Sequence, residues 1–322
     1  VYKRQVNGRM IGRGANDTKG NLAAMLIAMA ALKRTGLLLS GKIIGGVLCD
    51  EEDQMLGVQD FINRGHANDV NAAVICEPQD GMLCTSQKGA VRARFTITGR
   101  MSHGAMPLAG LNTAPALAKI IDGLNHLESV AVIQTGQHEH LGWPSFTPTV
   151  IQAPPVGAPQ LNVMPAKAVI LVDIRTTPHQ SHDHIRTQLT DLAKSTETKV
   201  RKEYMALNQR LNIDRDPRID IAVEFLTDRP CTHTDMDEPV VRAADWATRK
   251  VWDKTPTYGG VPGATDGTFL WSRKNIPIIT MGAGDREVPH QVDEWVDLSQ
   301  LIDTAKIYAL TAYHYLNAGD EA

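Results

Sequence analysis

The sequence lacks a long hydrophobic run, an excess of charge of one sign and a cysteine-rich pattern. Its 322 residues include only 4 Cys, and Lys plus Arg (33) nearly equals Asp plus Glu (36), for a formal net charge of -3. Binding to a nucleic-acid phosphate backbone requires a basic excess, so we expect no nucleic-acid partner. The longest uncharged apolar stretch, Leu22 to Leu32, is far shorter than the ~20 residues that span a bilayer, so we expect no membrane partner.

Cysteine spacing and the start of the chain bear on its compartment. No secretory signal precedes the first motif and no C-x-x-C spacing occurs, so we expect a cytoplasmic protein with reduced cysteines. Cys49 and Cys76 lie inside apolar runs, where we expect them to pack as small hydrophobic residues. The chain begins with Val1 rather than Met and soon reaches a glycine-rich segment. We therefore expect that its N-terminus has been cut.

Two patterns of secondary structure divide the chain. Residues 1–89 and 229–322 alternate helix and buried-strand signals, which is typical of an α/β domain. Residues 90–228 have the order β-α-β-β-α-β, the ferredoxin-like split arrangement, so we expect an α/β domain interrupted by an inserted antiparallel α+β domain. The predicted helices cover residues 21–34, 58–63, 114–127, 182–194, 239–251 and 298–316; the predicted strands cover 43–49, 72–76, 91–98, 147–153, 168–175, 219–226 and 277–280.

Acidic side chains follow successive predicted strands. Ligands of open α/β sheets bind outside the carboxyl ends of the strands. The segment Asp50-Glu51-Glu52 follows one strand, Glu77 follows the next, His290 lies in a later loop, and Asp17 precedes the first helix. Carboxylates clustered with an imidazole suit a divalent metal such as zinc, cobalt or manganese. Without a cation, their like charges would repel one another.

Each of these residues also has a simpler interpretation. Asp17 could cap the helix that follows it. The segment 50–52 could be an exposed acidic turn, Glu77 a polar strand end and His290 an ordinary loop histidine. Taken one at a time, these interpretations are favoured, but their joint position at successive strand ends favours a shared site.

Eight ordered motifs cover almost the whole chain. They are the segment Gly12 to Gly20; Asp50-Glu51-Glu52 with Gly57; Glu77-Pro78; Ser102-His103-Gly104-Ala105 with Pro107; Asn162 with Pro165; Asp173-Ile174-Arg175; Ala264-Thr265-Asp266-Gly267; and His290 with Glu294. In this order they resemble the zinc amidohydrolases and exopeptidases that include succinyl-diaminopimelate desuccinylase, acetylornithine deacetylase, aminoacylase and glutamate carboxypeptidase. The resemblance implies a metallopeptidase-type catalytic domain in residues 1–89 and 229–322, and a dimerisation or lid domain in residues 90–228.

The resemblance also implies a metal centre. Asp17 would bridge two Zn²⁺ ions, Glu52 and His290 would complete one site, and Glu77 would belong to the other; Co²⁺ or Mn²⁺ could replace zinc. Glu51 would be the general base that takes a proton from the water between the metals. This role agrees with physical chemistry, because metal coordination lowers the pKa of water to about 7, where a nearby carboxylate can deprotonate it.

Substrate contacts are implied for both domains. Asn162 and Arg175 match the residues that hold the substrate carboxylate in relatives, and Thr265 and Asp266 are expected among the substrate-binding residues. His103 resembles the histidine that crosses from the partner subunit of a homodimer to stabilise the oxyanion. Two alternatives stay open: a local ion pair between Arg175 and Asp173, and a solvated surface position for His103.

One feature departs from the family pattern. Its members carry a His-x-Asp motif before the segment that matches Asp17, and that histidine binds the second zinc. No histidine precedes Asp17 here. His233-Thr234-Asp235 has the right letters after the inserted domain, and we expect it to be a loop without a metal role. We therefore expect two zinc ions per full-length subunit but only one complete site in this chain.

These observations predict a metal-dependent hydrolase. We expect it to use a metal-activated water to cleave the amide bond of an N-acyl amino acid, as a deacylase or desuccinylase does. One alternative is a dipeptidase or carboxypeptidase of the same architecture, with a small peptide as substrate. The other is a catalytically dead dimeric binding protein, or an inactive fragment.

Overall fold

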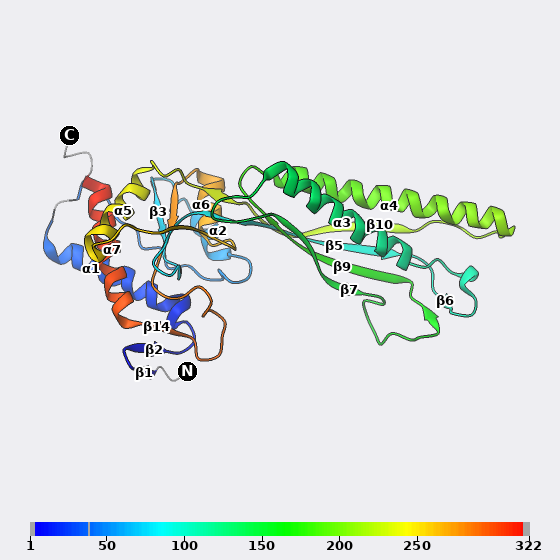
Figure 1. Ribbon diagram of the computed structural model, residues 1–322, viewed down its shortest axis with the longest axis horizontal. Helices are drawn as coiled ribbons and strands as arrows, with labels where there is room; N and C mark the ends of the chain where they lie inside the picture. Colours follow the sequence, from blue (N-terminus) through cyan, green and yellow to red (C-terminus); the bar gives the residue numbers. More distant parts are fainter. Residues whose placement is uncertain (1–3, 38, 318–322) are drawn as a thin grey trace. The chain divides into compact units, whose positions relative to one another are not determined.

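The computed structural model describes residues 4–37 and 39–317. Contacts between residues divide the chain into two units: unit 1 comprises residues 1–88 and 231–322, and unit 2 comprises residues 89–230 (Figure 1). Both units mix helices with strands, which confirms the predicted α/β class.

A mixed five-stranded sheet forms the centre of unit 1. Its main path has the order β11-β4-β13-β3, and β12 pairs with β4. The pairs β3–β13 and β4–β12 are parallel, whereas β11 runs antiparallel to β4. The strands are β3 (Ala73–Ile75), β4 (Leu83–Gln87), β11 (Thr232–His233), β12 (Tyr258–Val261) and β13 (Ile278–Thr280).

Helices cover both faces of this sheet. In β3, Val74 packs with the core formed by α1, α5 and α7, whereas Ala73 and Ile75 pack with the core formed by α2 and α6. Side chains alternate across a strand, so one short strand contributes to two cores. The helices are α1 (Asn21–Thr35), α2 (Leu56–Asn63), α5 (Pro239–Trp252), α6 (Gly267–Lys274) and α7 (Leu298–Asn317). Figure 1 shows α1, α5 and α7 gathered together within unit 1.

A small antiparallel sheet, which the sequence analysis missed, borders the candidate site. Its order is β1-β2-β14, with β1 (Arg4–Val6), β2 (Arg9–Ile11) and β14 (Trp295–Asp297). Ile11 pairs with Trp295. This ladder joins the segment just before Asp17 to the segment just after His290.

Unit 2 has the predicted β-α-β-β-α-β order. Its antiparallel sheet has the strand order β10-β5-β9-β7, and α3 and α4 contribute to the single core beside it. Alternate residues of β5, including Phe95 and Ile97, and of β9, including Ile170 and Ile174, are fully buried. The elements are β5 (Gly89–Thr98), β6 (Ser102–His103), α3 (Ala114–Thr135), β7 (Ser145–Gln152), β8 (Val163–Met164), β9 (Lys167–Thr176), α4 (His182–Leu211) and β10 (Asp220–Arg229).

The helix α4 is longer than predicted. It continues past Lys194 to Leu211 because Thr196 and Val200 extend its buried face, while charged residues occupy the other side. Within residues 4–37 and 39–317, every helix is too short or too polar to cross a bilayer.

The predicted strand over residues 43–49 is wrong. These residues have no regular secondary structure, and no described strand forms a ladder with them. Ile44 and Val47 are 44% and 61% exposed, and Cys49 is exposed rather than packed in a core. A strand requires a hydrogen-bonding neighbour, and an apolar run by itself does not supply one. Cys76, the other cysteine expected in a core, is half-buried.

Candidate metal centre

Three potential metal ligands converge in unit 1. His290 Nε2 lies 2.9 Å from Glu52 Oε1 and 3.4 Å from Asp17 Oδ2. One ligand atom from each residue lies within 4.8 Å of the others. Three side chains that are far apart in the sequence thus offer their ligand atoms to one position, which a single divalent ion could contact. They are the residues that the sequence analysis assigned to one complete site.

The segment before α1 directs Asp17 into this cluster. Asp17 lies in the tight turn Ala15–Gly20, and its side chain is 20% exposed. The N-cap of α1 is Gly20, without any side-chain capping bond, so the alternative interpretation of Asp17 as a helix cap is wrong. Thr18 Oγ1 donates to the carbonyl of Cys76 at 2.7 Å. This bond ties the turn to the end of β3, directly beside Glu77.

Glu52 lies in a turn that Asp50 holds in shape. Asp50 Oδ2 accepts the backbone N–H of Gln54 at 3.1 Å and of Leu56 at 3.3 Å. The Glu52 side chain is 61% exposed and contacts His290. Its hydrogen bond and its charge raise the pKa of His290. Glu51, the preceding residue, is half-buried.

Glu77 is electrostatically coupled to the cluster, although it does not join the three converging ligand atoms. Burial is the largest cause that raises its pKa well above the ordinary value, and the charge of Asp17 is the next. The charges of Glu51, Asp266 and Glu52 raise it further. Burial and the charge of Glu52 also raise the pKa of Asp17. The pKa values of both carboxyl groups are thus raised by the same two causes, burial and the negative charge of neighbouring carboxylates.

A divalent cation fits this donor set. Carboxylate oxygens and one imidazole nitrogen are the ligands that zinc and similar ions use in proteins. A cation also reverses the electrostatic penalty, because it stabilises the ionised forms that burial and mutual repulsion disfavour. His233, the histidine of the misplaced His-x-Asp motif, lies elsewhere: its Nδ1 is 2.9 Å from Ser86 Oγ.

Thr265 and Asp266 lie beside the cluster, held by a buried amide. Gln87 Nε2 donates to Thr265 Oγ1 at 2.9 Å and to Thr280 Oγ1 at 2.7 Å, and Gln87 Oε1 accepts the N–H of Thr265 at 3.1 Å. Thr265 is only 5% exposed. Its hydroxyl therefore serves this internal network, whereas Asp266 contributes charge next to Glu77.

His103 and Asn162 lie together within unit 2. The strand β6 pairs with β8, His103 opposite Val163, and the N–H of Gly104 donates to the carbonyl of Asn162 at 2.6 Å. The exposed ring of His103 accepts the N–H of Ala105 on Nδ1 at 3.1 Å. A neutral imidazole with an accepting Nδ1 carries its proton on Nε2. Nε2 is thereby a donor that the loop itself does not use.

Arg175 forms the local ion pair that the sequence analysis left open. Its Nε donates to Asp173 Oδ1 at 2.5 Å, and Arg92 Nε donates to Asp173 Oδ2 at 2.9 Å. Burial would raise the pKa of Asp173, but its hydrogen bonds from Arg175 and Arg92 lower it below the ordinary value. Arg175 is also far from Asn162, because the extended strand from Lys167 to Arg175 spans about 26 Å. Within a single chain the two residues are therefore too far apart to hold one carboxylate.

Glu294 supports the turn of Asp17, a role that was not predicted from the sequence. Its Oε1 accepts the N–H groups of Asn16 and Asp17, each at 2.9 Å. Its Oε2 accepts the N–H of Gly14 at 3.1 Å and Arg13 Nη1 at 2.9 Å. Burial would raise the pKa of Glu294, but these hydrogen bonds lower it. The only signal in the sequence was its position four residues after His290.

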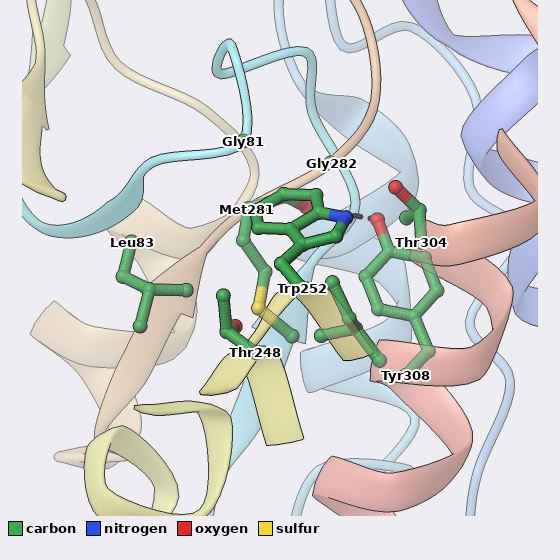
Figure 2. A pocket seen from close by; sticks show the side chains of 9 residues that line it. Gly81, Leu83, Thr248, Trp252, Met281, Gly282, Thr304 and Tyr308 are labelled. Atoms are coloured by element: carbon green, nitrogen blue, oxygen red, sulfur yellow. Dashed lines mark hydrogen bonds between the residues drawn. The ribbon is translucent and has the colours of Figure 1, made fainter. Parts of the chain in front are cut away.

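A small cavity of unit 1 has too little room for a substrate. It lies between α5, α7 and the sheet, with Trp252, Met281 and Tyr308 among its lining (Figure 2). Its volume is about 10 Å³, which is room for roughly one water molecule. Within its lining, Tyr308 donates its hydroxyl to the carbonyl of Met281 at 2.8 Å.

The sequence of this chain is similar to those of a known protein family. Residues 2–314 match the profile of peptidase family M20/M25/M40. A probable succinyl-diaminopimelate desuccinylase of Staphylococcus epidermidis (strain ATCC 12228 / FDA PCI 1200) is 24% identical over 323 residues, which cover 94% of this chain and 74% of that protein.

Solved structures have the same fold. Aminopeptidase PepT from Bacillus cereus ATCC 10987 superposes with a TM-score of 0.75 at 18% identity, covering 98% of this chain and 76% of that one. A Bacillus subtilis protein described as a dinuclear metal-binding peptidase from the M20 family has a TM-score of 0.65 at 16% identity, covering 92% and 72%.

The raised pKa of Glu77 predicts how the stability of the metal-free protein depends on pH. The folded state binds more protons than the unfolded state above the ordinary pKa of 4.5, so stability falls as pH rises from there towards the raised pKa. The variant Glu77→Gln cannot ionise. In chelator at about pH 7.5 we expect it to be more stable than the wild type, by about 1.4 kcal/mol for each tenfold change in the acid dissociation constant.

Urea unfolding between about pH 5 and pH 8 measures this effect. The same substitution at the exposed Glu139 of unit 2 is the control, and it should leave the pH dependence unchanged. Equal pH slopes for the wild type and Glu77→Gln would contradict the prediction.

Proposed function

The chain belongs to peptidase family M20/M25/M40 and is a hydrolase of that family, and from this premise we propose that it cleaves the amide bond of an N-acyl amino acid. The products would be a carboxylic acid and an amine. The observation that carries the proposal is the convergence of Asp17, Glu52 and His290 beside three further carboxylates, those of Glu51, Glu77 and Asp266. The relative that is named a probable desuccinylase supports an acyl amino acid rather than a long peptide as substrate.

We propose Zn²⁺ as the metal, with Asp17, Glu52 and His290 as ligands of one ion and Glu77 as a ligand of a second. The structural relative described as dinuclear supports two ions. When bound, such ions polarise the scissile carbonyl and lower the pKa of water.

Glu51 is the proposed general base. Its carboxylate takes a proton from the attacking water, whose oxygen adds to the carbonyl carbon. The same carboxylate then delivers the proton to the amine nitrogen as the C–N bond breaks, so that protons balance over the reaction. Its neighbour Glu52 turns towards His290, and adjacent residues can therefore divide the two roles.

We propose that the protein is a homodimer and that His103 donates from Nε2 to the oxyanion at the site of the partner. In unit 1, the bond between Gln87 and Thr265 places Asp266 near the boundary with unit 2. In unit 2, the ten residues of β5 separate the boundary from the loop of His103 by about 30 Å. The length of β5 is a property of unit 2 alone. It separates His103 from the residues that join the two units, and this supports action of His103 on another copy.

Arg175 is the proposed anchor for the substrate carboxylate, because a guanidinium binds a carboxylate in a planar, two-pronged manner. Its ion pair with Asp173 would then hold the guanidinium in place. Asn162 precedes β8, beyond the end of β9 that is far from Arg175, so it would join Arg175 at one carboxylate only if the two residues came from different subunits. A homodimer provides that combination.

The variant Glu51→Gln tests the general base. We expect kcat for an N-succinyl or N-acetyl amino acid to fall by about 10²-fold or more, because the amide cannot accept the proton. Zinc content, measured by elemental analysis, should equal that of the wild type. The control Asp53→Asn removes an exposed acid two residues away and should leave kcat nearly unchanged. Full activity of Glu51→Gln would exclude Glu51 as the base, and turnover of dipeptides alone would favour a dipeptidase.

The variant Arg175→Lys tests the carboxylate anchor. Lysine keeps the charge but loses the planar fork, so we expect kcat/KM to fall roughly 10- to 150-fold for substrates that carry a free carboxylate. Substrates without that carboxylate should be affected much less. The control Arg92→Lys removes the other arginine of Asp173 and should leave this selectivity intact. Equal losses of kcat/KM for both substrate types would mean that Arg175 only forms the local ion pair with Asp173 and does not bind the substrate carboxylate.

Mixing two inactive variants, His103→Ala and Glu51→Gln, tests action between subunits. In a mixed dimer, one site combines an intact Glu51 with an intact His103 from the partner. Because half the dimers are mixed and each has one good site, we expect about a quarter of wild-type activity. Subunit exchange is verified by mass spectrometry of labelled protein. Exchange without recovery of activity would place His103 in its own subunit or outside catalysis.

A further inference from the structure

Glu294 is a buried carboxylate with an unusual set of partners. Its residue is 2% exposed, and it accepts hydrogen bonds from three backbone N–H groups of a single turn. That turn carries Asp17, while Glu294 itself follows His290 by four residues. We propose that Glu294 is a positioning residue, which fixes the carboxylate of Asp17 relative to His290 at the metal centre. The inference rests on the proposed function of that centre as a metal site.

The bonds of Glu294 continue an existing ladder. Ile11 pairs with Trp295, and the N–H of Gly12 donates to the carbonyl of Glu294 at 2.7 Å. Beyond Gly12 the backbone leaves the ladder. There the carboxylate of Glu294, instead of a strand backbone, accepts the N–H groups of Gly14, Asn16 and Asp17. The segment before α1 is thus held by Glu294 through both its backbone and its side chain, up to Asp17 itself.

Only a carboxylate satisfies these donors. Each of the two oxygens accepts two hydrogen bonds: Oε1 from Asn16 and Asp17, and Oε2 from Gly14 and Arg13. A glutamine would direct its NH₂ group at one of these pairs, and that group has no acceptor capacity. A buried N–H group would lose its partner, and the turn would have to move.

Movement of this turn acts directly on the metal ligands. The N–H of Asp17 belongs to the same residue as the ligand carboxylate, so a shift of the turn displaces that carboxylate from its place 3.4 Å from His290. Partners that orient ligands typically change metal affinity 10- to 100-fold when they are replaced. Arg13 is a lesser contributor, because its side chain is 57% exposed.

Zinc titration of the chelator-treated protein tests the proposal. We expect Glu294→Gln to bind Zn²⁺ about 10- to 100-fold more weakly than the wild type in isothermal titration calorimetry. The visible absorption of Co²⁺ should also change in the variant, because the ligand geometry is altered. The matched control Asp297→Asn makes the same change three residues later, in an exposed ion pair with Arg9, and it should keep wild-type affinity within about twofold.

The outcomes separate the two hypotheses. Zinc binding by Glu294→Gln that equals the wild type, or equal weakening in Glu294→Gln and Asp297→Asn, would overturn the positioning role while leaving the metal site intact. Absence of zinc binding in the wild type would overturn the proposed function itself. If Glu294→Gln does not fold, Glu294→Asp keeps the charge on a shorter side chain. We then expect weaker zinc binding with little loss of thermal stability, and unchanged affinity would overturn the proposal.

Discussion

Repulsion between carboxylates is the constraint on which the arrangement of unit 1 depends. Burial raises the pKa of Glu77 most, and the charges of Asp17, Glu51, Asp266 and Glu52 raise it further. A folded chain can keep several carboxylates close together only where the packing around them opposes their mutual repulsion. Here that structure consists of two apolar cores on opposite faces of one sheet, with the acidic residues confined to the loops and strand ends between them. The metal centre is thus held together by packing that contains none of its ligands.

Much of this fold was predictable because its periodic segments are long. The alternation along β5 and β9 and the four-residue spacing of Ala24, Ala28 and Leu32 in α1 each identify one element. The convergence of Asp17, Glu52 and His290 was predictable for a different reason. All three residues belong to motifs that resemble those of one family; strand ends do not account for their convergence, because residues 43–49 before Glu52 form no strand and Asp17 lies in the turn before α1.

Other features depend on partners that a local pattern cannot reveal. The strand β4 is fully buried although it contains Thr85, Ser86 and Gln87, because neighbours elsewhere in the chain satisfy such groups, as Thr265 and Thr280 do for Gln87. The opposite error occurred at residues 43–49, where an apolar run is not part of a sheet. Glu294 was missed because its significance lies in backbone N–H groups that are 277 to 280 residues away in the sequence.

The chain enters and leaves unit 2 along neighbouring strands, since Ala90 of β5 pairs with Arg229 of β10. Paired positions of this kind have Cα atoms about 5 Å apart. The two ends of the inserted unit are therefore as close together as the two ends of a tight turn. Unit 2 also contains its own hydrophobic core. A segment of this kind can be gained, lost or exchanged during evolution without rebuilding the sheet that receives it. The catalytic scaffold and the inserted unit are therefore free to diverge at different rates.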